Sequence, residues 1–253
     1  MRARPRRSSS LFWRALLPLS LRMSVATAAN PPTPPRLLIT IEGTIGAGKS
    51  TVMRALYEDY SASEGPVQFV DEPVESWINA PVNLLEAMYT GQLAHPAFQL
   101  MALATRAGPV VAALRSSRVV ISERSVWSDK TVFAEIGLKD PATRAAYDLA
   151  HSSLREAMPS HLRELLILLD VPIETAVARI AQRGRPEEAS IDRAYLQLLE
   201  EGHSRLAALP GVEIVRIDAS KSIDDVVAAV RAVIAREVDE TSPDEKCESE
   251  AGV

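Results

Sequence analysis

Short apolar runs recur along the chain, separated by longer stretches in which apolar residues are spaced more widely. Runs rich in Val, Ile and Leu are typical of strands that helices cover on both faces. We expect strands over residues 37–41, 67–70, 118–122, 165–169 and 212–217. The stretches between and after them predict helices over residues 49–60, 84–89, 98–114, 173–182 and 223–236.

This alternation of strands and helices predicts an α/β fold in three layers. The expected architecture is a doubly wound parallel sheet of about five strands with helices on both faces. In such a sheet, ligands bind at the carboxyl ends of the strands. Gly43, Glu72 and Glu123 each lie at or just beyond a predicted strand end, so we expect them to meet in one crevice.

Residues 41–51, IEGTIGAGKST, follow directly on the first predicted strand and carry the GxxxxGK[ST] spacing of a phosphate-binding loop. Glycines allow successive backbone N–H groups to point at one anion, and the following helix adds its positive N-terminal end. The lysine of such a loop reaches the outer phosphates, and the serine hydroxyl binds Mg²⁺. We expect the nucleotide to be bound by Gly43, Thr44, Ile45, Gly46, Ala47, Gly48, Lys49, Ser50 and Thr51.

Two acidic residues at strand ends are further candidates. Pro73 favours an extended backbone at Glu72, which keeps this carboxylate out of a regular helix; a solvated loop acid is the alternative. Glu123 ends a strand as a metal-binding acid does, so we expect it and Ser50 to hold the metal. Glu123 and Arg124 could also form an ordinary surface pair.

Two arginines later in the chain suggest an anion site. Arg179 and Arg183 are four residues apart and share one helix face, where like charges are unfavourable unless an anion is present. A cationic helix end capped by Gly184 is the alternative.

Four motifs stand in one order along the chain: IEGTIGAGKST at 41–51, DEPVESW at 71–77, ERSVWSD at 123–129 and ARIAQRGRPEE at 178–188. With these motifs, residues 37–236 resemble the deoxynucleoside kinase family. The resemblance implies a P-loop kinase fold, ATP as phosphoryl donor with Mg²⁺, and a lid that contains Arg179, Arg183 and Arg185. It also implies that Glu72 accepts the proton of the attacking hydroxyl, while Lys49 and Arg124 face the phosphates.

A nucleoside pocket is also implied by this resemblance. It assigns the base edge to Gln99, Arg106 and Asp129, the packing on the base to Trp77 and Phe133, and the sugar 3′-hydroxyl to Tyr89 and Glu188. Gln99 and Arg106 are two helical turns apart and share one helix face, and Asp129 and Phe133, four residues apart, share a face of another helix. A buried Arg106 and Asp129 should form a pair, because either charge alone would be uncompensated.

The resemblance extends to the choice of base and of nucleotide. The Arg106 and Asp129 combination is similar to that of family members that accept deoxycytidine or purine deoxynucleosides. We therefore expect deoxyguanosine, deoxyadenosine or deoxycytidine to be favoured over thymidine. Asp218, Ala219 and Ser220 stand where the family closes a loop around adenine; an ordinary turn is equally consistent with this triplet.

The function expected from these residues is transfer of the ATP γ-phosphoryl group to the 5′-hydroxyl of a deoxynucleoside, in nucleotide salvage. A nucleoside monophosphate kinase such as thymidylate kinase is the alternative, but a carboxylate at position 72 would repel a monophosphate. A non-catalytic nucleotide-binding protein is a weaker alternative. A GTPase is disfavoured because the NKxD sequence is absent.

Composition and charge bear on partners and domain organisation. The chain has 253 residues, 47% of them hydrophobic, and a net charge of −5. We expect a kinase domain over residues 37–236 and an acidic disordered tail over 237–253, where seven acids stand with one Lys. We expect no nucleic-acid partner, because the body is acidic, and no membrane partner, because no apolar run approaches ~20 residues. By resemblance we expect a homodimer.

The first 36 residues hold seven Arg and no acid, with apolar residues between the basic ones. This pattern is typical of an organelle transit peptide, so we expect residues 1–36 to be a presequence, disordered or cleaved, with a mitochondrial address. A secretory signal and a cytosolic form that starts at Met23 are the alternatives. The single cysteine, Cys247, allows no intrachain disulfide.

Overall fold

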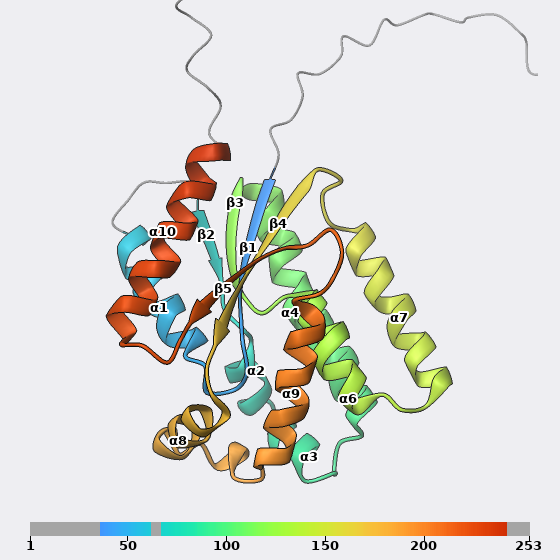
Figure 1. Cartoon of the computed structure of the whole chain (residues 1–253). Helices are drawn as coiled ribbons and strands as arrows, with labels where there is room; N and C mark the ends of the chain where they lie inside the picture. Colours follow the sequence, from blue (N-terminus) through green and yellow to red (C-terminus); the bar gives the residue numbers. More distant parts are fainter. Residues whose placement is uncertain (1–35, 62–66, 242–253) are drawn as a thin grey trace, which may run out of the picture. The chain divides into compact units, whose positions relative to one another are not determined.

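The computed structural model describes residues 36–61 and 67–241. Its centre is a five-stranded sheet in which every neighbouring pair is parallel. The strands are β1 (Arg36–Glu42), β2 (Val67–Val70), β3 (Val119–Glu123), β4 (Leu162–Asp170) and β5 (Glu213–Asp218), in the order β2-β3-β1-β4-β5 (Figure 1). The predicted strands are all present, and the predicted α/β fold is confirmed.

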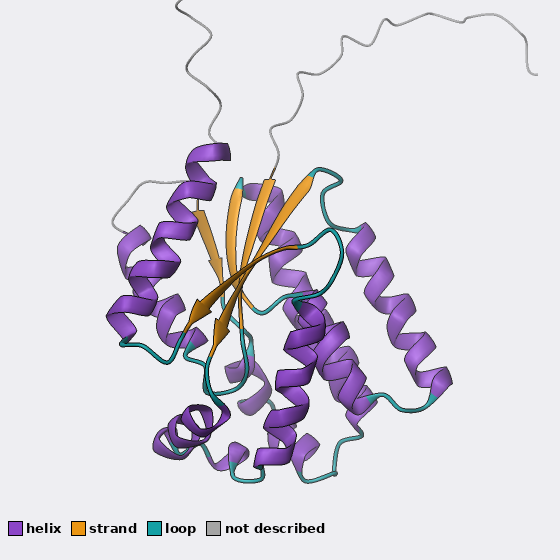
Figure 2. Ribbon diagram, in the orientation of Figure 1, coloured by secondary structure: helices purple, strands orange, loops and turns teal. Residues whose placement is uncertain are grey.

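Helices cover both faces of this sheet, which explains why its strands are apolar throughout. Alternate residues of a strand face opposite sides. Leu37 and Ile39 of β1 pack in a core with α1 (Lys49–Ser61) and α10 (Ile223–Thr241). Leu38 packs instead with α4 (His95–Ser116), and Leu166 of β4 packs with α9 (Arg193–Leu206). Figure 2 shows the resulting helix, sheet and helix layers.

Shorter helical segments and α7 complete the described part of the chain. Most of the short segments lie on the connections that leave the carboxyl ends of the strands (Figure 1). The short segments are α2 (Val74–Ile78), α3 (Leu84–Tyr89), α5 (Val126–Ser128), the π-helix η1 (Asp129–Ala134), α6 (Glu135–Gly137), α8 (Ile173–Arg183) and the 3₁₀-helix η2 (Pro186–Glu188). The longer helix α7 spans Pro141–Glu156.

The structure differs from the sequence prediction at several helices. Neither α7 nor α9 was predicted, and Asp129 and Phe133 lie on a π-helix, not on an α-helix. The last helix, α10, continues to Thr241, five residues into the predicted tail. Glu237 in this extension is buried and pairs with Arg163 at 2.5 Å, so it belongs to the packed domain. The predicted presequence, apart from Arg36, and residues 242–253 lie outside the described residues.

Within the described residues, α4 is the single helix long and apolar enough to cross a membrane by length and composition. Its position in the fold accounts for this composition. Val110, Ala113 and Leu114 pack against the sheet, while Leu103 and Ala107 belong to a second buried cluster that contains Tyr147 of α7. A helix with two covered faces is apolar over most of its circumference.

Candidate active site

A cavity of about 480 Å³ opens at the carboxyl ends of the strands. Segments that follow β1, β2 and β3 meet in it, as predicted. Among the predicted site residues, its walls contain Ile45, Gly46, Gly48, Lys49, Ser50, Thr51, Glu72, Trp77, Tyr89, Gln99, Arg106, Glu123, Arg124, Asp129, Phe133, Arg183, Arg185 and Glu188. The walls do not include Gly43, Thr44, Ala47, Arg179, Asp218, Ala219 or Ser220.

The phosphate-binding loop lies between β1 and α1 and needs glycine at two close approaches. A Cβ atom at Gly43 would lie 2.7 Å from the Leu169 carbonyl oxygen, and one at Gly46 would lie 2.7 Å from the Ala176 carbonyl oxygen. Both glycines have positive φ, 142° and 82°. The loop therefore packs directly against β4 and α8, which leaves no room for side chains at Gly43 and Gly46.

Lys49 begins α1 and folds back over this loop. Its Nζ donates to the carbonyl oxygens of Gly43 at 3.2 Å and Thr44 at 3.0 Å. Burial lowers the pKa of Lys49 to about 8, and the nearby positive charge of Arg124 acts in the same direction. A polyphosphate at the loop would raise this pKa again, because it supplies negative charge close to the ammonium group.

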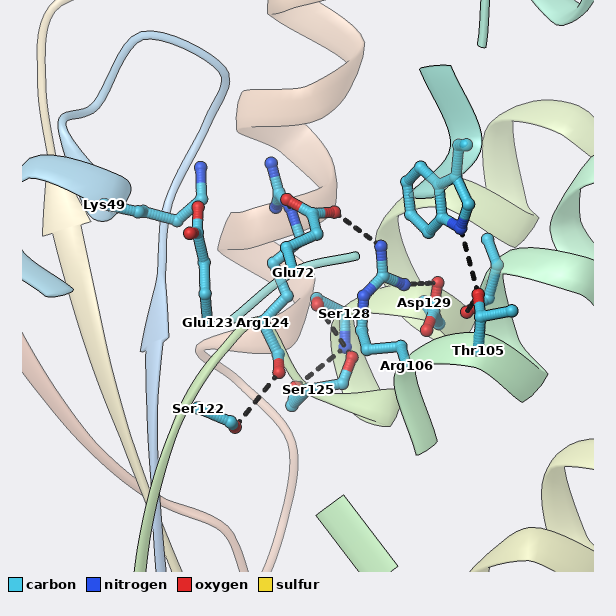
Figure 3. A network of polar contacts seen from close by, with 12 residues as sticks. Lys49, Glu72, Thr105, Arg106, Ser122, Glu123, Arg124, Ser125, Ser128 and Asp129 are labelled. Atoms are coloured by element: carbon cyan, nitrogen blue, oxygen red, sulfur yellow. Dashed lines mark hydrogen bonds and ion pairs between the residues drawn. The ribbon is translucent and has the colours of Figure 1, made fainter. Parts of the chain in front are cut away.

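Glu72 follows β2 and is held by two guanidinium groups. Arg106 Nη2 lies 2.6 Å from its Oε1, and Arg124 Nε lies 3.2 Å from the same carboxylate. Burial raises the pKa of Glu72, but the positive charges of Arg124 and Arg106 outweigh burial and bring the pKa to about 2. Figure 3 shows this carboxylate between two groups of side chains, Arg106 and Asp129 on one side and Lys49 and Glu123 on the other.

Arg106 and Asp129 form the predicted buried pair. Arg106 is 4% exposed and Asp129 is 1% exposed, and Arg106 Nη1 donates to Asp129 Oδ1. Burial raises the pKa of Asp129, although Arg106 opposes the shift. Trp77 lies beside the pair, with the Arg106 guanidinium 5.6 Å from its ring centroid, and its Nε1 donates to Thr105 Oγ1 at 3.0 Å. The pair thus forms a polar patch beside an aromatic wall, a suitable surface for a nucleobase.

Ser50 and Glu123 lie together at the start of α1 and the end of β3. Ser50 Oγ donates to Glu123 Oε1 at 3.0 Å, and burial raises the pKa of Glu123. Among the described residues there is no cluster of three or more His, Cys, Asp or Glu suited to a metal. A hydroxyl and a carboxylate fit Mg²⁺, which is commonly bound through one or two protein groups, substrate phosphates and water.

The predicted lid comprises the end of α8 and η2. Arg183 donates to both carboxylate oxygens of Glu188 at 2.7 Å, and Arg185 also lines the cavity. Gly184 caps α8 in the left-handed conformation with φ 64°, as the alternative of a helix end capped by Gly184 predicted.

Arg179 does not line this cavity and contacts the backbone beside it. Its Nη1 lies 3.3 Å from the Ala47 carbonyl oxygen, and its Nη2 lies 2.9 Å from the Ala219 carbonyl oxygen. Arg179 therefore joins the phosphate loop to the predicted adenine loop. Asp218 accepts hydrogen bonds from Ser220 N and Oγ, which is the ordinary turn weighed as the alternative.

Several cavity residues were missed by the sequence prediction. Tyr195 lies on α9, its ring meets that of Tyr89 edge-on with centroids 6.4 Å apart, and burial raises its pKa to about 12. Its helix had a recognisable signal, since Asp192 caps it by accepting from Tyr195 N. Phe98 and His95 of α4 also line the cavity.

Comparison with known proteins assigns the chain to a family. The deoxynucleoside kinase family model matches residues 39–241. A thymidine kinase of Ictalurid herpesvirus 1 is 32% identical over 215 residues, which cover 81% of this chain and 91% of that protein. Deoxycytidine kinase 2 of Gallus gallus is 31% identical, over 65% of this chain and 71% of that protein. A thymidylate kinase of Acinetobacter baylyi is 27% identical over 74% of this chain and 92% of that protein.

A solved structure supports the fold. Deoxyadenosine kinase from M. mycoides, with products dCMP and a flexible dCDP bound, has a TM-score of 0.65 and 22% identity, and the match covers 79% of this chain and 99% of that one. This similarity confirms the P-loop kinase arrangement of sheet and helices. The family match over residues 39–241 shows that the chain belongs to the deoxynucleoside kinase family of ATP-dependent enzymes.

Proposed function

We propose that this enzyme transfers the γ-phosphoryl group of ATP to the 5′-hydroxyl of a deoxynucleoside. The observation that carries the proposal is the position of Glu72, which shares one cavity with the phosphate loop and with the buried Arg106 and Asp129 pair. Phosphoryl transfer needs a residue that accepts the proton of the attacking hydroxyl, placed between nucleotide and acceptor. Glu72 is the carboxylate placed to do so.

In this proposal the phosphate loop and Lys49 bind the ATP phosphates, and Ser50 and Glu123 hold Mg²⁺, which supplies charge neutralisation at the phosphates. Arg124 orients Glu72 and stabilises negative charge on the transferred group. The lid residues Arg183 and Arg185 exchange the contact with Glu188 for phosphate oxygens when ATP binds. Glu188 is then free to bind the sugar 3′-hydroxyl with Tyr89.

The base preference that we propose is for deoxycytidine, deoxyadenosine or deoxyguanosine over thymidine. Asp129 is an acceptor and Arg106 a donor, and both are rigidly paired and buried. Deoxyguanosine is included from the family resemblance alone, since the guanine O6 is also an acceptor; cytosine and adenine carry an amino donor where thymine carries a carbonyl acceptor. That carbonyl would face the Asp129 carboxylate, and two acceptors left unpaired in a buried site are unfavourable.

A thymidylate kinase activity is the second candidate, because one relative carries that name. The site argues against it. A nucleoside monophosphate would bring a phosphate dianion next to the Glu72 carboxylate, which is already ionised because its pKa is about 2. A neutral 5′-hydroxyl meets no such repulsion.

Purified protein assayed with ATP and Mg²⁺ against the four deoxynucleosides and their 5′-monophosphates tests these proposals. We expect turnover of deoxynucleosides, with deoxycytidine or the purines above thymidine in kcat/KM. Turnover of monophosphates alone would refute the proposed reaction. Preferential turnover of thymidine would refute only the base preference.

A further inference from the structure

Glu42 is a buried carboxylate for which the proposed reaction has no role so far. It is the last residue of β1, directly before the phosphate loop, and it is 0% exposed. Its Oε1 accepts from Ser125 N at 2.7 Å and from Ser125 Oγ at 2.6 Å. Ser125 stands 83 positions further along the chain, in the segment that follows β3. Glu42 therefore ties the phosphate loop to this second segment.

The segment that Glu42 holds contains a strained turn. Arg124, between Glu123 and Ser125, has φ 65° and is the only non-glycine residue with positive φ in the part of the chain that the structure describes. A residue with a Cβ atom avoids this conformation unless its surroundings hold it there. Arg124 N donates to the Ile41 carbonyl oxygen at 3.1 Å, and the Ser125 bonds to Glu42 fix the next residue.

This turn determines where the Arg124 guanidinium points. Its Nε lies 3.2 Å from the Glu72 carboxylate, and its Nη1 donates to the Gly43 carbonyl oxygen at 3.2 Å. The same Nη1 lies 4.0 Å from Glu42 Oε2. That oxygen has no hydrogen-bond partner; burial raises the pKa of Glu42, and the Arg124 charge opposes this shift, as do hydrogen bonds from Ser125 and the Ser128 side chain. Figure 3 shows Arg124 next to Glu72 and Glu123, with Ser125 further away, beside Ser128.

We propose that Glu42 is a positioning residue for phosphoryl transfer: its carboxylate holds the turn at Arg124 and Ser125 so that the Arg124 guanidinium meets Glu72 beside the phosphate loop. The inference depends on the proposed reaction, in which Glu72 and Arg124 take part. Glu42 itself touches neither nucleotide nor nucleoside in this arrangement. Its effect on turnover passes through Arg124.

Glu42→Gln is the informative substitution because it preserves shape. Glutamine Oε1 can still accept from Ser125, but its amide group brings donors, and no charge, to Arg124. Small displacements of a catalytic group lower rates strongly. We expect kcat to fall about 30-fold, while the KM values for ATP and nucleoside change less than about threefold. Nucleotide-binding stoichiometry, measured by calorimetry, gives the active fraction and corrects kcat for any unfolded protein.

Glu237→Gln is the matched control. Glu237 is also a buried glutamate, 1% exposed and paired with arginines, but it lies on α10 away from the cavity. Glu237→Gln, like Glu42→Gln, replaces a buried carboxylate with a neutral amide. We expect kcat per active site to remain that of the unmodified enzyme. An equal loss of kcat in both variants would show that any buried charge change lowers turnover and would overturn the proposal.

A double-mutant cycle with Arg124→Ala separates positioning from general stability. If Glu42 acts through Arg124, Glu42→Gln should lower kcat less than about threefold in the Arg124→Ala background, compared with about 30-fold in the unmodified enzyme. Ser125→Ala removes one of the two hydrogen bonds to Glu42, and its effect on kcat should also be much smaller in the Arg124→Ala background. This variant replaces Glu42→Gln in the cycle if Glu42→Gln does not fold. Independent, multiplicative losses would overturn the inference.

The two proposals fail in different ways. An unmodified enzyme that does not phosphorylate deoxynucleosides refutes the proposed function, whatever the variants do. An active enzyme whose Glu42→Gln variant keeps its kcat refutes only the role of Glu42.

Discussion

At the scale of single residues, Glu72 is paired with two arginines, and we expect it to accept the proton of the attacking hydroxyl. Glu72→Gln removes the proton acceptor and retains the size of the side chain. We expect kcat to fall by about 10²–10⁴ because general-base catalysis contributes that much, while ATP binding survives. Steady-state kinetics and nucleotide titration measure both quantities. Glu75→Gln is the control, since Glu75 lines the same cavity but is exposed; equal losses in the two variants would remove Glu72 from the mechanism.

The pKa of Lys49, about 8, predicts an alkaline limit for ATP capture. Free enzyme loses the Lys49 charge as the pH rises through this value, so kcat/KM for ATP should fall about tenfold per pH unit above it. In the ATP complex the phosphate charge raises the pKa of Lys49, and the limit of kcat should lie at higher pH. Rate profiles between pH 6 and 10 measure both limits. In Lys49→Arg, whose guanidinium does not titrate in this range, the limit should be absent from any residual activity.

Asp129 should determine which base is accepted. Asp129→Asn keeps the side-chain shape but turns an acceptor into an amide that can donate or accept. The site would then tolerate the thymine carbonyl, and the kcat/KM ratio of deoxycytidine to thymidine should fall by about 10–100-fold. The substrate panel described above measures this ratio. An unchanged ratio would show that base choice is made elsewhere in the cavity.

At the scale of elements, the close packing of the phosphate loop against α8 can be tested by substituting Gly46. Gly46→Ala would place a Cβ atom 2.7 Å from the Ala176 carbonyl oxygen, so the loop and α8 must move apart. We expect the KM for ATP to rise at least about tenfold, because the phosphate cradle is displaced. Gly211→Ala is the control: its φ of 77° is similarly strained, but no atom lies within 4 Å of the added Cβ. A similar KM in both variants would mean that backbone strain alone is responsible.

How much of these elements could be predicted depends on how far apart the interacting residues lie. The five strands and the loop at 41–51 were predicted because apolar runs and glycine spacing are local signals. The helix α7 was missed because its interior stripe is narrow, with Tyr147 and His151 as its fully buried residues. The link from Glu42 to Ser125 spans 83 positions and leaves no pattern in either segment. Contacts of this kind require the fold.

At the scale of the whole molecule, the extent of the folded domain follows from α10. Glu237, four residues before the end of this helix, is buried and ion-paired, and the family match also ends at residue 241. A chain ending at residue 236 removes Glu237 and leaves Arg163 without this carboxylate. Arg163 is 34% exposed and also contacts Glu213, so water and a second acid limit the loss to about 1–3 kcal/mol.

This loss should lower the midpoint of thermal unfolding by about 2–12 °C for a domain of this size. Differential scanning calorimetry of chains 36–236 and 36–241 measures it, with ATP and nucleoside absent so that ligand binding does not mask the difference. The variant Glu237→Gln in the longer chain separates the charge from the helical turn. We expect it to recover part of the midpoint, because the glutamine amide still fills the buried site and accepts from Arg163. Equal midpoints for the two chains would place the end of the folded domain at residue 236, as the sequence alone had predicted.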